Sequence, residues 1–280
     1  MLLSQGTRLR APEIDEIALW RRLLAEGLGS AFLAAVVVGS GIAAQQLSPG
    51  AAGLELFENA SATAAGLFAI TLMFGPVSGG HFNPVVSFVD AASGGLRWAH
   101  ALAYLPAQVA GCVGGAVVAN LMFGEAAVTL STKHRASGAH FLAEVVATVG
   151  LLLVIFSLAR TGRSRNAPAA VGAYIGAAYF FTSSTSFANP AIAIGRMLTD
   201  SFAGIAPSSV PVYVGGEVVG AVLGLLLVKT LYSGVLAVGV AEVAVPHLQV
   251  AAAESAHDSN QGARQEYDLT VATAAQEETV

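Results

Sequence analysis

Two Asn-Pro dipeptides offer the clearest chemistry in the sequence. Asn83–Pro84 lies in the run Ser-Gly-Gly-His-Phe-Asn-Pro-Val, and Asn189–Pro190 lies in Thr-Ser-Phe-Ala-Asn-Pro-Ala. Asn is among the best helix N-caps and Pro is favoured at the first helical position, so a helix should begin at each proline. The apolar runs that follow end near Asp90 and Thr199. Each predicts a helix of about 15 Å, half the thickness of a bilayer's hydrocarbon core.

Two such half-helices, entering a membrane from opposite faces, would meet near its midplane. There the helix N-termini carry partial positive charge, and the side-chain amides of Asn83 and Asn189 can donate hydrogen bonds. The unwound segments 78–82 and 185–188 offer backbone carbonyls as acceptors. Neutral, hydroxyl-bearing solutes could follow this path, whereas a cation or proton would meet a positive barrier. The predicted pore centre comprises Asn83, Pro84, Val85, Asn189, Pro190 and Ala191.

Four further polar residues interrupt long apolar segments, and a histidine precedes the first box. Membrane carboxylates are functional suspects, so Glu26 and Glu144 could relay protons. Their matching positions favour a structural role, in which each carboxylate accepts backbone N–H groups of an unwound loop. We interpret Gln108 and Glu217 in the same way, although Glu217 carries charge where Gln108 carries none. His81 could sense pH, but we favour a fixed hydrogen bond beside the first half-helix.

The composition indicates an integral membrane protein. Of the 280 residues, 55% are hydrophobic and 11% are charged, against about 25% charged in soluble domains. Apolar stretches of roughly 20 residues can span a bilayer, and they predict an all-α fold with six transmembrane helices and two re-entrant half-helices. The predicted spans are about 20–44, 60–77, 98–122, 138–159, 167–185 and 209–232.

The sequence contains two repeats, at about 20–122 and 138–235. Three features of the first half recur in the second in the same order, at shifts of 118, 106 and 109 residues. The recurring pairs are Glu26 and Glu144, Asn83 and Asn189, and Gln108 and Glu217. Three spans per half is an odd number, so the two halves must be inverted relative to each other. One channel domain is therefore predicted over 20–235.

Basic residues predict the orientation. Ten of the 13 Lys and Arg residues fall on the side that holds both termini, so the positive-inside rule places both termini in the cytoplasm. Segment 1–19 is too charged for the core of a signal peptide, and we interpret it as a cytoplasmic N-terminal segment. The tail at 244–280 is rich in Ala, Glu, Gln and Ser, which is typical of a disordered extension. We expect a multi-pass protein of the cell membrane.

Over about residues 20–232, the chain resembles the aquaporin and glycerol-facilitator family. The resemblance rests on Ala25–Gly29, Ser78–Val85, Phe187–Ala191, Gln108 and Glu217. It implies a homotetramer in membrane lipid, with one pore for small neutral solutes in each protomer. No cofactor or metal is expected, and the sequence offers no basic surface for nucleic acid.

The sequence departs from this family at the predicted constriction. Family members usually carry an Arg directly after the second box, where this chain has Ile192, and the first box ends in Val85 rather than Ala. Counting from each Asn places the selectivity filter at Thr63, Ala177, Ser186 and Ile192. These small or aliphatic side chains predict a wide, weakly polar filter. Arg196 lies one helical turn beyond Ile192, and we hypothesise that it screens cations in the outer vestibule. An ion pair with Asp200 or a contact with another loop is the alternative.

We expect a passive channel for small neutral solutes. Glycerol-sized polyols, urea or neutral metalloid acids such as arsenite are favoured over strict water selectivity. The arsenite link comes from the resemblance, because some divergent members of the family are linked to arsenic handling. An ion-coupled secondary transporter is the first alternative, since inverted repeats and broken helices also build carriers. A water-selective channel and a membrane junction protein are the others. An enzyme is not expected, because the sequence shows no Ser-His-Asp set, metal-ligand cluster or phosphate loop.

Overall fold

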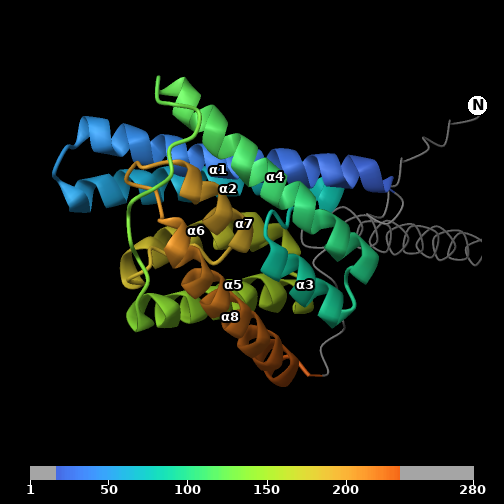
Figure 1. Ribbon diagram of the computed structural model, residues 1–280. Helices are drawn as coiled ribbons and strands as arrows, with labels where there is room; N and C mark the ends of the chain where they lie inside the picture. The colour runs from blue at the N-terminus through green and yellow to red at the C-terminus, as the bar shows by residue number, and fades with distance from the viewer. Residues whose placement is uncertain (1–16, 234–280) are drawn as a thin grey trace, which may run out of the picture. The chain divides into compact units, whose positions relative to one another are not determined.

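The chain is helical throughout the part that the structure describes, and no strand occurs there. The computed structural model describes residues 17–233 (Figure 1). Its α-helices are α1 (Leu19–Leu47), α2 (Ala52–Ser78), α3 (Pro84–Ser93), α4 (Trp98–Met122), α5 (Gly138–Arg160), α6 (Ala167–Phe181), α7 (Pro190–Gly195) and α8 (Val210–Leu231). Short 3-10 helices lie at Ser164–Asn166, Arg196–Leu198 and Pro207–Ser209. The predicted tail at 244–280 and residues 1–16 of the predicted N-terminal segment lie outside the described residues.

The predicted helices are confirmed, but three of their ends are wrong. The second half-helix is predicted to run to about Thr199, but α7 ends at Gly195, and the chain continues as the 3-10 helix Arg196–Leu198. α2 begins at Ala52 instead of near residue 60. Glu55 lies in its first turn, where the helix dipole favours an acid, and its carboxylate accepts a hydrogen bond from Gly50 N at 3.1 Å. Glu55 therefore belongs to the first turn of α2 and not to the loop before it. α6 ends at Phe181 instead of near residue 185, because Thr182 turns to an extended backbone.

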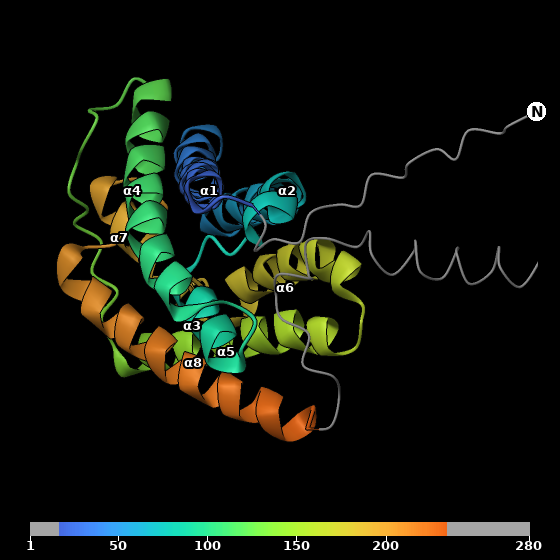
Figure 2. The same cartoon turned by 90° about the vertical axis from the view of Figure 1, so that its right-hand side faces the viewer.

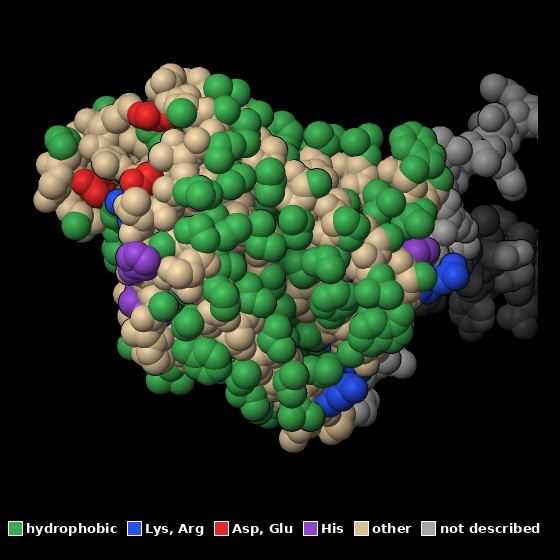
Figure 3. All heavy atoms as spheres, viewed as in Figure 1, with side chains coloured by type: hydrophobic (Ala, Val, Ile, Leu, Met, Phe, Trp, Pro, Cys, Tyr) green, Lys and Arg blue, Asp and Glu red, His purple; other side chains and the backbone are tan. Residues whose placement is uncertain are grey.

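The outer surface matches a protein that crosses a membrane several times. Five segments are long and apolar enough to span a bilayer: α1, α2, α4, α5 and Pro207–Leu231. α6 has only 15 residues, which gives about 22 Å of helix. In Figure 3, charged and His side chains gather towards two ends, and apolar side chains cover the surface between them. Large exposed hydrophobic residues include Phe32, Leu72, Leu102 and Leu226. This belt provides the surface that lipid requires.

The two halves, α1–α4 and α5–α8, repeat one packing scheme. α1 packs against α2 and α4, and α5 packs against α6 and α8. The α1–α4 pair lies side by side in both views (Figures 1 and 2). α2 contacts α6 across the halves, and each half-helix, α3 or α7, contacts both α4 and α8. The loops that lead into the half-helices are therefore enclosed by helices of both halves.

Glycines let the long helices approach each other, and more closely in the first half. A Cβ atom on Gly115 of α4 would lie 2.0 Å from the carbonyl oxygen of Ala31 in α1. A Cβ on Gly220 of α8 would lie 2.7 Å from the Cβ of Thr148 in α5. The α1–α4 contact is thus between backbones, whereas the α5–α8 contact is partly between side chains.

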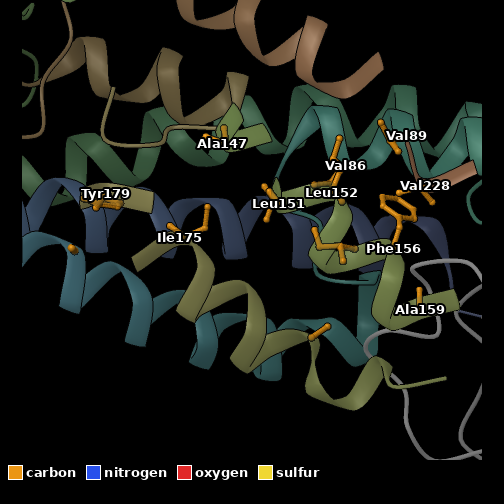
Figure 4. Packing of buried hydrophobic residues seen from close by; sticks show 14 residues of the cluster. Val86, Val89, Ala147, Leu151, Leu152, Phe156, Ala159, Ile175, Tyr179 and Val228 are labelled. Carbon is orange, nitrogen blue, oxygen red and sulfur yellow. The ribbon is translucent and has the colours of Figure 1, made fainter. Parts of the chain in front are cut away.

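A buried hydrophobic cluster joins the first half-helix to the second half of the molecule (Figure 4). Most of its members come from α3, α5, α6 and α8, and they include Val86, Val89, Leu151, Leu152, Phe156, Ile175, Tyr179 and Val228. Ile175 and Tyr179 are four residues apart on α6 and so share one face of that helix. This face of α6 points inward, so its residues are candidates for the lining of a pore.

Candidate functional site

Both half-helices begin as their Asn-Pro boxes predict. Asn83 has an extended backbone, and its Oδ1 accepts a hydrogen bond from Val85 N at 3.0 Å. For α7, Asn189 Oδ1 accepts from Ala191 N at 3.0 Å and from Ile192 N at 3.4 Å. A proline follows each Asn at the first helical position, where no backbone N–H is needed. Side chain and backbone together thus fix the start of each half-helix.

The two caps are also linked to each other. Asn83 Nδ2 donates to the carbonyl oxygen of Ala188 at 2.7 Å, and Asn189 Nδ2 donates to the carbonyl oxygen of Phe82 at 2.8 Å. Each acceptor is the residue directly before the other Asn. An Asn amide has two hydrogens, so each link leaves one hydrogen for the cavity that both Asn side chains line.

The residues before the two caps have an unusual backbone. Phe82 and Ala188 have φ angles of 48° and 47°, in the left-handed region that costs a non-glycine residue about 1–2 kcal/mol. Buried carboxylates hold both. Phe82 N donates to Glu26 Oε2 and Ala188 N donates to Glu144 Oε2, each at 2.7 Å. These are contacts of the kind that the loop-support prediction requires.

The last helix of each half adds a third contact. Gln108 Nε2 of α4 donates to Glu26 Oε2 at 2.8 Å. Glu217 of α8 accepts instead, through Oε1, from the backbone N–H of Asn189 at 2.9 Å. Both side chains are fully buried. The two residues occupy matching places, but only Glu217 also accepts a hydrogen bond from a backbone N–H group.

His81 lies at the base of the first half-helix. Its backbone N–H donates to Glu26 Oε1 at 3.0 Å. Its ring Nδ1 lies 3.0 Å from Ser87 Oγ, and its Nε2 lies 3.6 Å from Asp90 Oδ2. The ring is buried on the cavity wall. The hydrogen bond between Nδ1 and Ser87 is of the kind that the fixed hydrogen-bonding role requires.

A cavity lies between the two halves and has a volume of about 80 Å³. A single water molecule needs roughly 10–15 Å³ of such space, so several fit. One part of the lining is polar and comes from the unwound loops and the caps: Gly79, Gly80, His81, Asn83, Ser186 and Asn189. Another part is aliphatic and comes from the long helices: Leu33, Val37, Leu67, Leu151, Ile155 and Ile175. The lining thus combines hydrogen-bonding groups with apolar groups. Pro84, Val85, Pro190 and Ala191 are not among the lining residues.

Three polar side chains meet on the cavity wall beside the second loop. Thr63 Oγ1 lies 3.2 Å from the hydroxyl of Tyr179, and both residues line the cavity. Arg196 also lines it, with its guanidinium 3.6 Å above the ring of Phe187 and its Nε donating to the carbonyl of Ala203. Ser186 and Ile192 complete this part of the lining.

The predicted filter residue Ala177 is wrong. Its side chain is exposed on the outside of α6, whereas Val171, Ile175 and Tyr179 line the cavity. The count from Asn189 reached Ala177, which lies two residues before Tyr179, the residue on the inward face of α6. The spacing of four between these inward residues is a helical face, and this signal in the sequence could have identified Tyr179.

Of the interpretations of Arg196, the contact with a loop is the one that the structure shows, because its Nε donates to the carbonyl of Ala203 in the segment after the second half-helix. Its side chain is buried and lines the cavity. An ion pair with Asp200 is not seen among the described residues. The Asp200 carboxylate accepts from Thr132 N at 2.8 Å and from the Thr132 hydroxyl, and the N–H contact holds the pKa of Asp200 below its usual range. Asp200 thereby ties the α4–α5 connection to the segment that follows Arg196.

Two tyrosines that the sequence analysis did not single out donate hydrogen bonds to the segments that lead into the half-helices. The Tyr104 hydroxyl donates to the carbonyl of Ser78 at 2.8 Å, and the Tyr213 hydroxyl donates to the carbonyl of Ser184 at 3.5 Å. The two tyrosines are 109 residues apart, the same spacing that separates Gln108 from Glu217. The serines share the shift of 106 residues that relates the two Asn caps. The same comparison of halves could have found them.

Residues 13–188 match the model of the family described as Major intrinsic protein. The chain belongs to the major intrinsic protein family. It is 46% identical over 218 residues to Aquaglyceroporin AqpS of Rhizobium meliloti (strain 1021), a match that covers 78% of this chain and 93% of that protein. It is 32% identical over 213 residues to Aquaporin NIP1-3 of Oryza sativa subsp. japonica, covering 73% of this chain and 71% of that protein.

A solved major intrinsic protein has the same fold. The X-ray structure of the aquaglyceroporin from Plasmodium falciparum superposes with a TM-score of 0.60 and 19% identity, over 78% of this chain and 97% of that one. At this identity the match speaks for the fold alone. The predicted family and the predicted all-α, multi-pass membrane fold are confirmed, and the protein is a passive membrane channel. None of these comparisons supports the ion-coupled carrier.

Proposed function

We propose that this channel conducts water, glycerol and similarly small neutral solutes, and that it excludes ions. The observation that carries the proposal is the cavity between the halves, whose lining includes Asn83, Asn189, Thr63, Tyr179 and Arg196. The name of the Rhizobium relative, an aquaglyceroporin, supports glycerol. Urea and arsenite stay as further solutes to be tested.

The centre of the cavity suits a neutral solute. Each Asn keeps one amide hydrogen for the lumen, and the positive ends of α3 and α7 lie beside them. A hydroxyl group can accept from these donors and donate to a loop carbonyl. A cation would lose its hydration shell where the surrounding potential is positive. We therefore assign the pore centre to both Asn-Pro boxes, with the Asn side chains as the groups that contact solute.

The filter that we propose contains a larger and more polar set of side chains than the sequence analysis assigned to it. We assign it to Thr63, Tyr179, Ser186, Ile192 and Arg196. The hydroxyls and the guanidinium offer hydrogen bonds, while Ile192 offers an apolar contact. A polyol presents hydroxyls on one side and C–H groups on the other, so it matches this division. An aromatic ring and an arginine also limit the size of solute that passes.

The proposal includes the membrane context. We infer a homotetramer in the cell membrane, with both termini in the cytoplasm. The orientation rests on the distribution of Lys and Arg. The apolar belt of exposed side chains between the charged ends supports contact with lipid and with other protomers.

Stopped-flow light scattering on proteoliposomes, comparing water with glycerol, tests the proposal. We expect both fluxes above those of empty liposomes. Replacing Tyr179→Ala removes the ring from the wall and should raise glycerol flux several-fold. Phe180→Ala is the matched control, since Phe180 is the adjacent aromatic residue and is exposed. Water flux without glycerol flux in the native protein would establish a water-selective channel instead.

The role of Arg196 has its own readout. Arg196→Ala should raise the leak of small cations, because it removes the cationic side chain from the cavity wall. A dye-based measurement of proton or K⁺ entry into the same liposomes detects this. An unchanged leak in Arg196→Ala would reject the assignment of Arg196 to the filter while leaving the channel function intact.

A further inference from the structure

Glu217 stands where the repeat predicts an amide. In the first half, Gln108 uses its amide nitrogen to donate to Glu26. In the second half, the carboxyl group of Glu217 is in hydrogen-bond contact with the carboxyl group of Glu144. Both carboxyl groups are fully buried. Two ionised carboxylates in contact, away from water, would repel each other strongly.

A count of donors shows what this contact requires. The oxygens of Glu144 accept the N–H groups of Phe187 and Ala188 at 2.9 and 2.7 Å. Glu217 Oε1 accepts the N–H of Asn189, but its buried Oε2 finds no donor among residues 17–233. Its neighbour is the other carboxylate, which is itself an acceptor. One proton between the two groups satisfies both.

We propose that Glu217 is a neutral carboxylic acid in the working channel and donates its proton to Glu144. The proton belongs on Glu217 because Glu144 accepts two backbone N–H groups, which favour its ionised form, whereas Glu217 accepts one. Glu217 then acts as Gln108 does, as an uncharged donor to the carboxylate that holds the loop. Each half carries one buried negative charge at this place.

The proton has a consequence for ion exclusion. Glu217 Oε1 lies 2.9 Å from the backbone nitrogen of Asn189, at the N-terminus of α7. That end of the helix carries a positive charge of roughly half a unit. A second full negative charge beside it would cancel this potential and weaken the barrier at the pore centre. Glu217 is therefore a positioning residue that keeps its neighbourhood neutral. This consequence for ions rests on the proposed function, whereas the protonation itself does not.

Infrared difference spectroscopy of the full chain in liposomes tests the protonation directly. A buried, protonated carboxylic acid gives a C=O stretching band that shifts in D₂O. We expect this band in the native protein and its loss in Glu217→Gln. The control Glu125→Gln removes an exposed carboxyl group and should leave the band in place. A band that survives in Glu217→Gln, or no such band in the native protein, overturns the proposal whatever the fluxes are.

Transport measurements on the same samples test the consequence. Glu217→Gln keeps an uncharged donor and the acceptor for Asn189, so glycerol flux and proton exclusion should stay within about twofold of native. Glu217→Leu removes both and should lower glycerol flux at least tenfold. If the Leu variant does not fold, the Gln variant still decides. A tenfold loss of flux or a proton leak in Glu217→Gln would show that the carboxylate charge itself is needed, and would reject the proposal.

Discussion

In the first half of the molecule, Glu26 accepts four hydrogen bonds, whereas in the second half Glu144 shares its site with another acid. The donors to Glu26 are Ser78 Oγ, His81 N, Phe82 N and Gln108 Nε2. Glu144 accepts the backbone N–H groups of Phe187 and Ala188 and contacts Ser184 and Glu217. The shape of the support is the same in both halves, and its chemistry is not. Inverted repeats thus constrain where a side chain must be placed more strongly than which side chain it is.

A second difference concerns how the halves are packed. In the α1–α4 pair, Gly115 meets the backbone of Ala31 directly, whereas in the α5–α8 pair Gly220 meets the side chain of Thr148 as well. The second half is also tied from outside, because Asp200 binds Thr132 of the α4–α5 connection. The first half relies on close packing, and the second adds a connection across its surface.

The largest expected effect comes from removing the loop carboxylates. Glu26→Leu strands four donors. Glu144→Leu strands three, which are the N–H groups of Phe187 and Ala188 and the hydroxyl of Ser184. The proton of Glu217 is not counted, because it can leave when Glu144 is absent. Each buried donor without a partner costs about 1–3 kcal/mol. We expect both variants to lose stability, and Glu26→Leu to lose more. The yield of folded protein by size-exclusion chromatography and the unfolding temperature in detergent measure this.

Glu125→Leu is the control for that experiment, because it removes an exposed carboxyl group. Equal losses in Glu26→Leu and Glu144→Leu would mean that the number of donors does not set the cost, and the contrast between the halves would fail.

The next effect concerns the glycines. Gly115→Ala places a methyl group against a backbone carbonyl, which cannot move aside, and overpacking of this kind costs about 1–3 kcal/mol. Gly220→Ala meets a side chain together with a more distant carbonyl and should cost less. Gly114→Ala is the matched control, since a Cβ there has nothing within 4 Å. Unfolding temperatures rank the three. Gly220→Ala as the most destabilising of them would reverse the comparison of the helix pairs.

A smaller effect is expected from acid. The N–H of Thr132 lowers the pKa of Asp200 in the folded protein, so this contact stabilises the fold above the unfolded pKa of about 3.9 and is lost as pH falls through the lower folded value. Asp200→Asn should therefore lower the unfolding temperature slightly near neutral pH. Its difference from the native protein should shrink towards about pH 3. A difference that is the same at both pH values would remove Asp200 from this role.

The smallest effect is expected at Ala177, where the filter prediction made by counting from Asn189 disagrees with the structure. Ala177→Phe would block the pore if Ala177 lined the filter. The structure places it on the exposed side of α6, so glycerol and water fluxes should stay native. Stopped-flow assays of this variant beside Thr63→Phe, which should block, give the answer. A blocked Ala177→Phe channel would restore the original filter assignment.

The fold was predictable because its signals are long or repeated. Six apolar stretches and two matching Asn-Pro boxes predict the helices and half-helices, and both caps form at the expected residues. The contacts of Glu26 and Glu144 with the loops also follow from their matching positions. Of the predicted filter residues, Thr63, Ser186 and Ile192 line the cavity, but Ala177 does not, because the count from Asn189 reached the wrong face of α6. Two residues on a helix amount to about 200° of rotation, which exchanges an inward Tyr179 for an outward Ala177.

Two hydrogen bonds join the halves, one from Asn83 to Ala188 and one from Asn189 to Phe82. They have a consequence for the synthesis of the protein. A ribosome releases the first Asn-Pro box more than a hundred residues before the second. Until residue 188 arrives, Asn83 has no carbonyl to bind, and Phe82 keeps an unpaired oxygen at the depth of the bilayer centre, where such groups are costly. The first half therefore cannot settle alone after insertion. During biogenesis, the first loop has to stay shielded or hydrated until translation of the second half is nearly complete. The two halves then complete the pore together, when both Asn links form.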